Sequence, residues 1–108
     1  MPLFMTRVSY TAESWKAQIA NPQNREAQLK AVAEKKGGKI LGFYYVFGDY
    51  DVVVIQDSAD AITAASILIA VAGSGAIAKS ETNLLMSSAD GLEAIRRASE
   101  SGYTPPGN

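Results

Sequence analysis

Apolar and polar residues recur along this chain with two different periods, and the changes of period mark its elements. Alternation of β-branched and aromatic residues is typical of strands, whereas apolar residues three and four positions apart are typical of helices. The glycines and prolines that separate these stretches mark turns. On this basis the sequence predicts four strands, at residues 2–10, 39–47, 50–56 and 77–86.

The first predicted helix follows the first strand. Thr11 is expected to be its N-cap, because a threonine hydroxyl accepts a hydrogen bond from a free backbone N–H of the first turn. The helix should break at Asn21-Pro22, since a residue that precedes proline avoids helical angles. It resumes and stops at Gly37-Gly38, where glycine suits the backbone that follows a helix.

Two further helices are expected. Ser58 is a candidate N-cap for the second helix, which has Asp60 just inside it and runs to about Ala72. Ser87 or Ser88 caps the third helix. Two apolar residues spaced as on one side of a helix should form its inner face, Leu92 and Ile95.

The resulting order, β-α-β-β-α-β with an extra C-terminal helix, predicts an α+β protein of the ferredoxin-like type. In this fold one antiparallel sheet carries its helices on one face. We expect a single domain over residues 1–98, and a flexible tail over residues 99–108, whose sequence is polar and contains proline. The strands at residues 39–47 and 50–56 should form a hairpin through a two-residue Gly48-Asp49 turn.

Both faces of this hairpin are apolar. Strict alternation divides the second strand into Ile40, Tyr44 and Val46 on one face and Leu41, Phe43, Tyr45 and Phe47 on the other. The third strand divides into Val52 and Val54 against Val53 and Ile55. The protein's own helices cover one face only, and soluble monomers rarely expose a large apolar patch. The sequence therefore predicts a homodimer through the sheet face; it leaves open whether dimers assemble further.

Charge and composition exclude several classes of function. The net charge of the 108 residues is −1, which gives no basis for binding nucleic acid. There is no cysteine and no histidine, so disulfides, thiolate nucleophiles, histidine bases and the usual haem ligand are absent. We expect no cofactor, no metal and no membrane partner. Residues 61–78 carry no charge, but the glycines at 73 and 75 favour a buried helix, a turn and a strand over a membrane span.

Two local motifs are interpreted without a ligand. The sequence GSGAIA at residues 73–78 has the dinucleotide-binding spacing, but it follows a helix and precedes a strand, the reverse of the order that places phosphate at a helix N-terminus. Asp49, Asp51 and Asp57 are oxygen ligands of the kind that hard cations prefer. Their places in the turn and at the two ends of a strand are too far apart for one ion.

Charged residues in the predicted strands are candidate site residues. In the ferredoxin-like order the first strand lies between the third and the fourth, so Arg7 could neighbour Asp51 and Glu81. Arg7 and Asp51 could pair within a cleft. A structural ion pair and a small binding or catalytic cluster both fit this pattern.

Three tyrosines beside these charges are also candidates. Tyr44, Tyr45 and Tyr50 are expected in or next to the hairpin strands, where tyrosine usually packs its ring and directs its hydroxyl to a polar partner. A phenol near a carboxylate can also orient a small carbonyl or phenolic ligand. Packing and ligand binding are both retained as roles.

The stretch GGKILGFYYVFGDYDVVVI, followed by SET in the fourth strand, resembles the GYD domain family. The Gly-x-Tyr-Asp motif falls on Gly48, Tyr50 and Asp51, and the opening MPLFMTRVSYT and the proline-broken first helix are also similar. The resemblance spans residues 1 to about 95. It implies a subunit of the dimeric α+β barrel type and no particular activity. Arg7 stands where the resemblance implies an aliphatic residue.

Relatives with the dimeric α+β barrel architecture include cofactor-free monooxygenases, lactone isomerases, haem enzymes and ligand-sensing domains. The haem branch is disfavoured, since no histidine is present to hold iron. The first hypothesis is a homodimeric, cytoplasmic protein that binds a small apolar or aromatic molecule in a cavity between sheet and helices. The second is a cofactor-independent oxygenase or isomerase that uses Asp51 as base and Tyr50 or Arg7 as electrophile. The third is an interaction module with no ligand.

Overall fold

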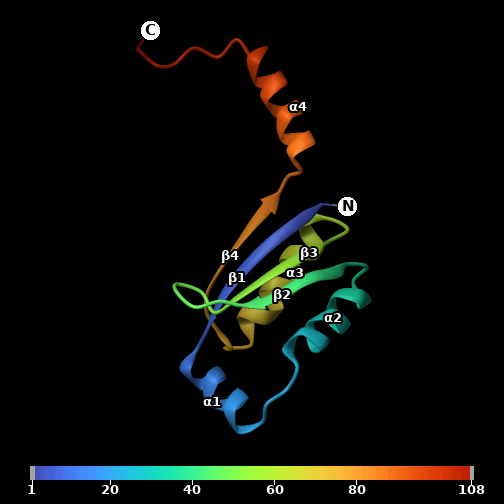
Figure 1. The fold of residues 1–108 in the computed structure, drawn as a ribbon, viewed down its shortest axis with the longest axis vertical. Helices are drawn as coiled ribbons and strands as arrows, with labels where there is room; N and C mark the ends of the chain where they lie inside the picture. Colours follow the sequence, from blue (N-terminus) through green and yellow to red (C-terminus); the bar gives the residue numbers. More distant parts are fainter. Residues whose placement is uncertain (1, 108) are drawn as a thin grey trace.

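Four strands and four helices follow one another in the computed structural model, which describes residues 2–107 (Figure 1). In chain order they are β1 (Leu3–Tyr10), α1 (Ala12–Ala20), α2 (Arg25–Lys35), β2 (Lys39–Tyr45), β3 (Val52–Asp57), α3 (Ala61–Gly73), β4 (Ile77–Leu85) and α4 (Ser88–Ser99). The break expected at Asn21-Pro22 separates α1 from α2.

The strands form one antiparallel sheet in the order β2-β3-β1-β4. Val8 of β1 lies opposite Val52 of β3, and Arg7 lies opposite Glu81 of β4. Residues that face each other across antiparallel strands share a face of the sheet, so this register assigns each side chain to one of two sides. The α+β class and the ferredoxin-like arrangement are confirmed.

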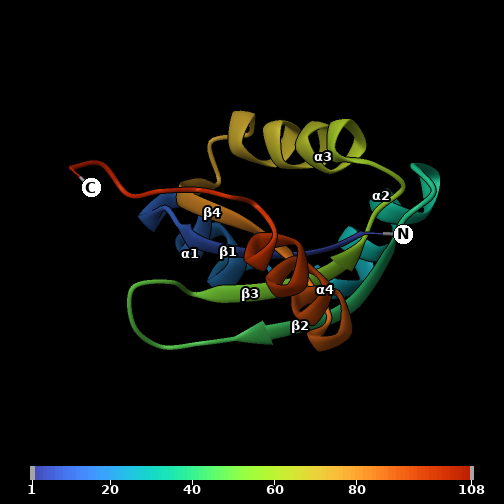
Figure 2. The same cartoon turned by 90° about the horizontal axis from the view of Figure 1, so that it is seen from above.

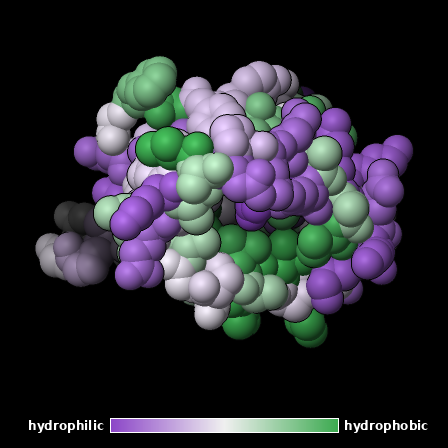
Figure 3. Space-filling model, turned by 90° about the horizontal axis from the view of Figure 1, so that it is seen from below, coloured by the Kyte–Doolittle hydropathy of each residue, from purple (hydrophilic) through white to green (hydrophobic). Residues whose placement is uncertain are grey.

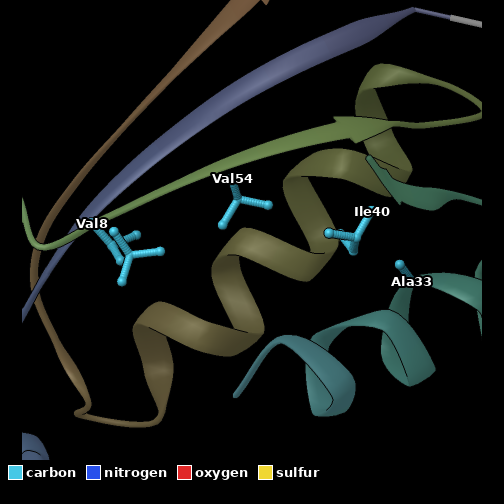
Figure 4. Packing of buried hydrophobic residues seen from close by; sticks show 5 residues of the cluster. Val8, Ala33, Ile40 and Val54 are labelled. Carbon is cyan, nitrogen blue, oxygen red and sulfur yellow. The ribbon is translucent and has the colours of Figure 1, made fainter. Parts of the chain in front are cut away.

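One face of the sheet, the helix-covered face, carries the core and is defined by Phe4, Val8, Val52, Val54 and Gln56. All five are at most 8% exposed. In Figure 4, Val8 and Val54 point from the strands toward α3, while Ala33 of α2 points toward Ile40 of β2. Helices α2 and α3 thus cover the same face at different strands.

Within residues 2–107 no helix packs along the opposite face. This face is called the bare face and is defined by Leu3, Met5, Tyr44, Val53 and Ile55. Its members alternate along the strands with the buried residues of the helix-covered face. Leu3 and Tyr44 are exposed, and the other three are half-buried. The predicted division of β3 into Val52 and Val54 against Val53 and Ile55 is confirmed.

The predicted division of the second strand is wrong, because a bulge interrupts β2 between Ile40 and Gly42. A bulge adds one residue to one strand of a pair, and alternation then resumes with the opposite phase. Phe43 therefore pairs with Val54 on the helix-covered face, together with Ile40, and Tyr44 lies on the bare face. The prediction of strict alternation places Ile40 and Tyr44 on the same face, which the bulge prevents.

The two-residue turn expected at Gly48-Asp49 is also wrong. Strand β2 ends at Tyr45 and β3 begins at Val52, so residues 46–51 form a longer loop. The Val46 N–H donates to the Asp51 carbonyl at 2.9 Å and closes it. Figure 2 shows the loop extending beyond the ends of both strands.

The helix caps agree with the sequence in two of three cases. Thr11 accepts from the Ser14 N–H at 3.1 Å, and Ser87 accepts from the Asp90 N–H at 3.1 Å, as predicted. The cap of α3 is Asp60, which accepts from the Thr63 N–H at 2.7 Å, and not Ser58. Ser58 is instead buried before the helix and donates to the Asp60 carbonyl.

Helix α4 projects away from the rest of the molecule (Figure 1). Leu92 and Ile95, expected on an inner face, are 48% and 67% exposed, and no residue of α4 is buried. The radius of gyration is 17.5 Å, against about 13 Å for a compact domain of this length. The helix is present as predicted, but its apolar side does not pack against the core of the same chain.

No helix within residues 2–107 combines the length and the apolar composition needed to cross a lipid bilayer. The uncharged segment at 61–78 consists of α3, a turn and the start of β4, as predicted.

Candidate functional site

A cavity of about 320 Å³ lies on the helix-covered face, between the sheet and helices α2 and α3. Its lining is mainly aliphatic and includes Leu29 and Val32 of α2, Val52 and Val54 of β3, and Ile67 and Val71 of α3. In Figure 3, hydrophobic residues gather on one side of a hollow and hydrophilic residues on the other. The volume is at the lower end of the range for small-molecule sites, about 300–1,000 Å³.

The polar groups of this cavity lie at different levels of the sheet. Gln56, 6% exposed, lies opposite Phe4, and Tyr10 lies beyond Val8 near the other end of β1. Thr6 lies between these levels, and its hydroxyl is hydrogen-bonded to that of Thr82 at 2.9 Å. Arg25, at the start of α2, also lines the cavity. The site is therefore a mainly apolar space with polar groups toward its two ends and Thr6 between them.

Tyr10 is the titratable phenol of this site. Burial raises its pKa above 10, and the nearby Tyr45 adds to the effect. The Arg25 guanidinium acts in the opposite direction, but its influence is smaller. Tyr10 is thus protonated at neutral pH, and its hydroxyl is able to donate a hydrogen bond. Its ring also packs edge-on against Trp15, with centroids 5.1 Å apart.

A second cluster of polar residues lies on the opposite side of the sheet, among the bare-face strands. Arg7 forms an ion pair with Glu81, which faces it across β1 and β4. The ring of Tyr50 lies 4.8 Å from the Arg7 guanidinium and also 4.8 Å from the Lys79 ammonium. Such cation–π contacts contribute about 0.5–1 kcal/mol each where they are exposed.

Asp51 does not pair with Arg7, contrary to the expectation from the sequence. One carboxylate oxygen of Asp51 accepts from the Tyr10 N–H at 2.9 Å, and the Asp51 N–H donates to the Val8 carbonyl at 2.8 Å. The Ser9 hydroxyl donates to the Asp49 carbonyl at 2.8 Å. These three bonds join the loop to the end of β1.

The Gly-x-Tyr-Asp motif therefore has a local structural explanation. Gly48 has φ +149°, a backbone angle that side-chain-bearing residues rarely adopt. Tyr50 packs against two cations of the bare face, and Asp51 holds the loop to β1. The motif therefore holds the β2–β3 loop in place. Tyr50 and Asp51 contact different partners and do not form one site.

The other two candidate tyrosines lie on opposite faces. Tyr44 is 61% exposed on the bare face, and its ring covers Gly42, where an added Cβ would approach the ring to 2.8 Å. Tyr45 packs edge-on against Phe43 of the helix-covered face, with centroids 5.6 Å apart. Arg7, Tyr50, Lys79 and Glu81 form a cluster that contains three of the predicted site residues.

None of the six predicted site residues is among the described residues that line the cavity. Tyr10, Arg25 and Gln56 are not among the site residues predicted from the sequence, which indicates an apolar cavity between sheet and helices but does not identify the residues that line it. One signal was available for Arg25, because a basic residue in the first turn of a helix is unfavourable to the helix dipole.

Potential metal ligands do not gather at any of these places. Within residues 2–107 no group of three or more histidine, cysteine, aspartate or glutamate residues is placed to hold a metal ion.

The single antiparallel sheet with helices on one face defines the class of protein, a ferredoxin-like α+β domain. The GYD domain model matches residues 4–95, most of the chain, so the chain belongs to the GYD domain family. The matched region includes the loop motif and also Leu92 and Ile95 of α4. No curated protein matches the sequence.

Proposed function

We propose that this protein is a homodimer that binds a small apolar or aromatic molecule on the helix-covered face of its sheet. The observation that supports binding is the cavity of about 320 Å³, which is partly open to solvent and is lined by aliphatic side chains of α2, α3 and β3. Protein interiors pack with few voids larger than a water molecule. A space of this size within the apolar layer fits a ligand better than a packing defect.

The bare face supports the dimer part of the proposal. Leu3, Met5, Tyr44, Val53 and Ile55 form a continuous apolar surface across three strands, and no helix of the same chain covers it. A second copy, packed face to face about a two-fold axis, buries this surface on both chains at once. The Arg7–Glu81 pair and Tyr50 then lie at the border of the interface.

Helix α4 gives independent support for a second copy. Its exposed Leu92 and Ile95 form an apolar side, while Glu93 pairs with Arg96 and Arg97 on the polar side. A helix of this pattern is stable when its apolar side packs against another surface. Since α4 projects from the end of β4, we propose that it packs on the partner chain.

Native mass spectrometry of the protein, purified directly from the cells that express it, tests both parts. The proposal predicts a dimer that carries an additional non-covalent mass, and that mass identifies the compound to assay. A strictly monomeric protein at micromolar concentration contradicts the dimer. A dimer with no retained mass, together with no stabilisation by any apolar compound in thermal unfolding, contradicts the ligand.

A cofactor-independent enzyme built on Asp51, Tyr50 and Arg7 is the weaker proposal. The Asp51 carboxylate is engaged by the Tyr10 N–H, whereas Tyr50 and Arg7 contact each other away from the cavity. A general base must reach the proton that it removes, within about 3 Å or through one water. No observation places these three groups around one substrate.

A further inference from the structure

The charges around the cavity identify the class of ligand. Of the described residues that line it, only Arg25 carries a formal charge at neutral pH. Arg25 is half-buried, and its guanidinium donates to the Gln28 side chain. It forms no ion pair within residues 2–107, although Glu13 lines a neighbouring groove that Arg25 also borders. A cation at an otherwise apolar cavity, without a carboxylate partner, is suited to an anionic ligand.

Tyr10 supplies a second donor next to this cation. Tyr10 and Arg25 both line the cavity, and the Arg25 guanidinium lowers the pKa of the Tyr10 hydroxyl against the larger effect of burial. A guanidinium binds a carboxylate through two parallel hydrogen bonds, and a protonated phenol donates one more. Both donors suit the planar oxygens of a carboxylate.

The remaining lining limits the size and character of the ligand body. From Val52 to Gln56 the inner side of β3 spans about 13 Å, at about 3.3 Å per residue. If each non-hydrogen atom of a ligand takes roughly the 30 Å³ that a water molecule occupies, the cavity holds about ten such atoms. The aliphatic side chains of Leu29, Val54 and Ile67 line this space. They suit a ligand whose body is apolar and uncharged.

We propose, on the basis of the proposed function, that the ligand is a small monocarboxylate with an apolar body. Its carboxylate pairs with Arg25 and accepts a hydrogen bond from the Tyr10 hydroxyl, and its body lies between α2, α3 and β3. The inference goes beyond apolar binding because it assigns a charge to the ligand and an orientation to it within the cavity.

Isothermal titration of the full chain at pH 8 with three probes of one shape tests the inference. The probes are 3-phenylpropanoate, 3-phenylpropanol and 3-phenylpropylamine, which are anionic, neutral and cationic at that pH. We expect the carboxylate to bind about tenfold more tightly than the alcohol, since hydrogen bonds between charged groups are the stronger ones. The amine should bind more weakly than the alcohol.

Two variants test whether Arg25 and Tyr10 cause the preference for the carboxylate. Arg25→Gln should abolish the preference for the carboxylate and leave the affinity for the alcohol unchanged, which also shows that the cavity is intact. Tyr10→Phe should weaken carboxylate binding by a few-fold. Lys30→Gln is the matched control, because it removes a positive charge from the same helix at a residue that does not line the cavity. It should retain the preference.

The outcomes separate this inference from the proposed function. Equal affinity for the carboxylate and the alcohol, or an unchanged preference in Arg25→Gln, overturns the inference and leaves apolar binding in place. Tighter binding of the amine overturns the sign of the assigned charge. Failure of all three probes to bind contradicts both the inference and the cavity as a ligand site.

Discussion

The two faces of the sheet are made by neighbouring residues of the same strands, but they differ in what covers them. Val52 and Val54 point to the helices and are buried, whereas Val53 and Ile55 point to the bare face and are half-buried. The helix-covered face contains a cavity with few polar groups, and the bare face contains the charged cluster around Arg7 and no helix. The charged cluster around Arg7 and the cavity are thus on opposite sides of the sheet, and Arg25 is the one charged residue among the described residues that line the cavity.

This difference shows why the conspicuous residues of the sequence do not mark the cavity. The Gly-x-Tyr-Asp motif and the Arg7–Glu81 pair organise a loop and a sheet surface. The cavity depends instead on the separation of α2 and α3, which contact the sheet at β2 and β4 respectively. The space between the two helices is lined by aliphatic side chains, with Arg25 and Tyr10 among its polar groups.

The largest expected contrast comes from the same substitution at adjacent positions of β3. Val54→Asp places an unpaired carboxylate in the core, which costs several kcal/mol out of a total stability of about 5–15 kcal/mol. We expect this variant to lose cooperative unfolding in a thermal melt. Val53→Asp should fold, because its side chain faces outward, but should be monomeric by size-exclusion chromatography with light scattering.

If Val53→Asp also fails to fold, the bare face is part of an essential core. If it remains a dimer at micromolar concentration, the proposed interface is wrong.

Truncation of one isoleucine on each face should give a smaller contrast of the same kind. In the Val53→Asp background, Ile67→Ala should lower the free energy of unfolding by about 2–4 kcal/mol, since it removes a side chain that is 6% exposed. Ile55→Ala in that background should cost less than about 1.5 kcal/mol, because Ile55 is half-buried. Urea denaturation measures the free energy of unfolding of both variants. Equal decreases would contradict the claim that helices cover only one face of the sheet.

Asp51 distinguishes a structural role of the loop motif from a catalytic one. Asp51→Ala removes the acceptor of the part-buried Tyr10 N–H and should lower the free energy of unfolding by about 1–3 kcal/mol. Asp51→Asn keeps an oxygen acceptor and should recover most of that stability. Chemical denaturation of the two variants makes the comparison. Equal losses would show that the negative charge, and not the hydrogen bond, is what the position requires.

The smallest expected effect is a pH dependence at the start of α3, on the helix-covered side. Hydrogen bonds with Thr63 lower the pKa of the Asp60 carboxyl below its usual 3.8. A lowered folded-state pKa stabilises the protein above the unfolded pKa, and this stabilisation is lost as the pH falls through the folded value. The acid side of the stability curve should therefore be flatter below about pH 4 in Asp60→Asn than in the wild type. If stability falls with pH equally steeply in Asp60→Asn and the wild type, the Asp60 carboxylate does not stabilise α3 as its N-cap.

The sequence predicted the elements well because their signals are local. Proline at position 22 separates α1 from α2, and Thr11 and Ser87 cap their helices through contacts three residues away. The bulge in β2 and the extended loop were missed because they depend on pairing with β3 and on bonds to Val8 and Tyr10 of β1. Strict alternation has no information about such non-local contacts.

The candidate site was predicted less well for a physical reason. Sequence patterns identify titratable residues, but a cavity is a space whose lining here is the ordinary Leu, Val and Ile of two helices and a strand. Arg25 and Tyr10 are separated by a helix and a turn in the sequence and line one cavity only after α2 packs on β2. The family resemblance predicted the fold but identified no residue that lines the cavity.

The central claim is that a ligand occupies the helix-covered face while the bare face belongs to the dimer. Methyl-labelled NMR spectra recorded during titration with 3-phenylpropanoate test it most directly, because methyl groups report the face on which each side chain lies. We predict that the methyl signals of Leu29, Val54 and Ile67 shift together with one saturating affinity, while those of Val53 and Ile55 stay in place. Shifts confined to Val53 and Ile55 would contradict the account.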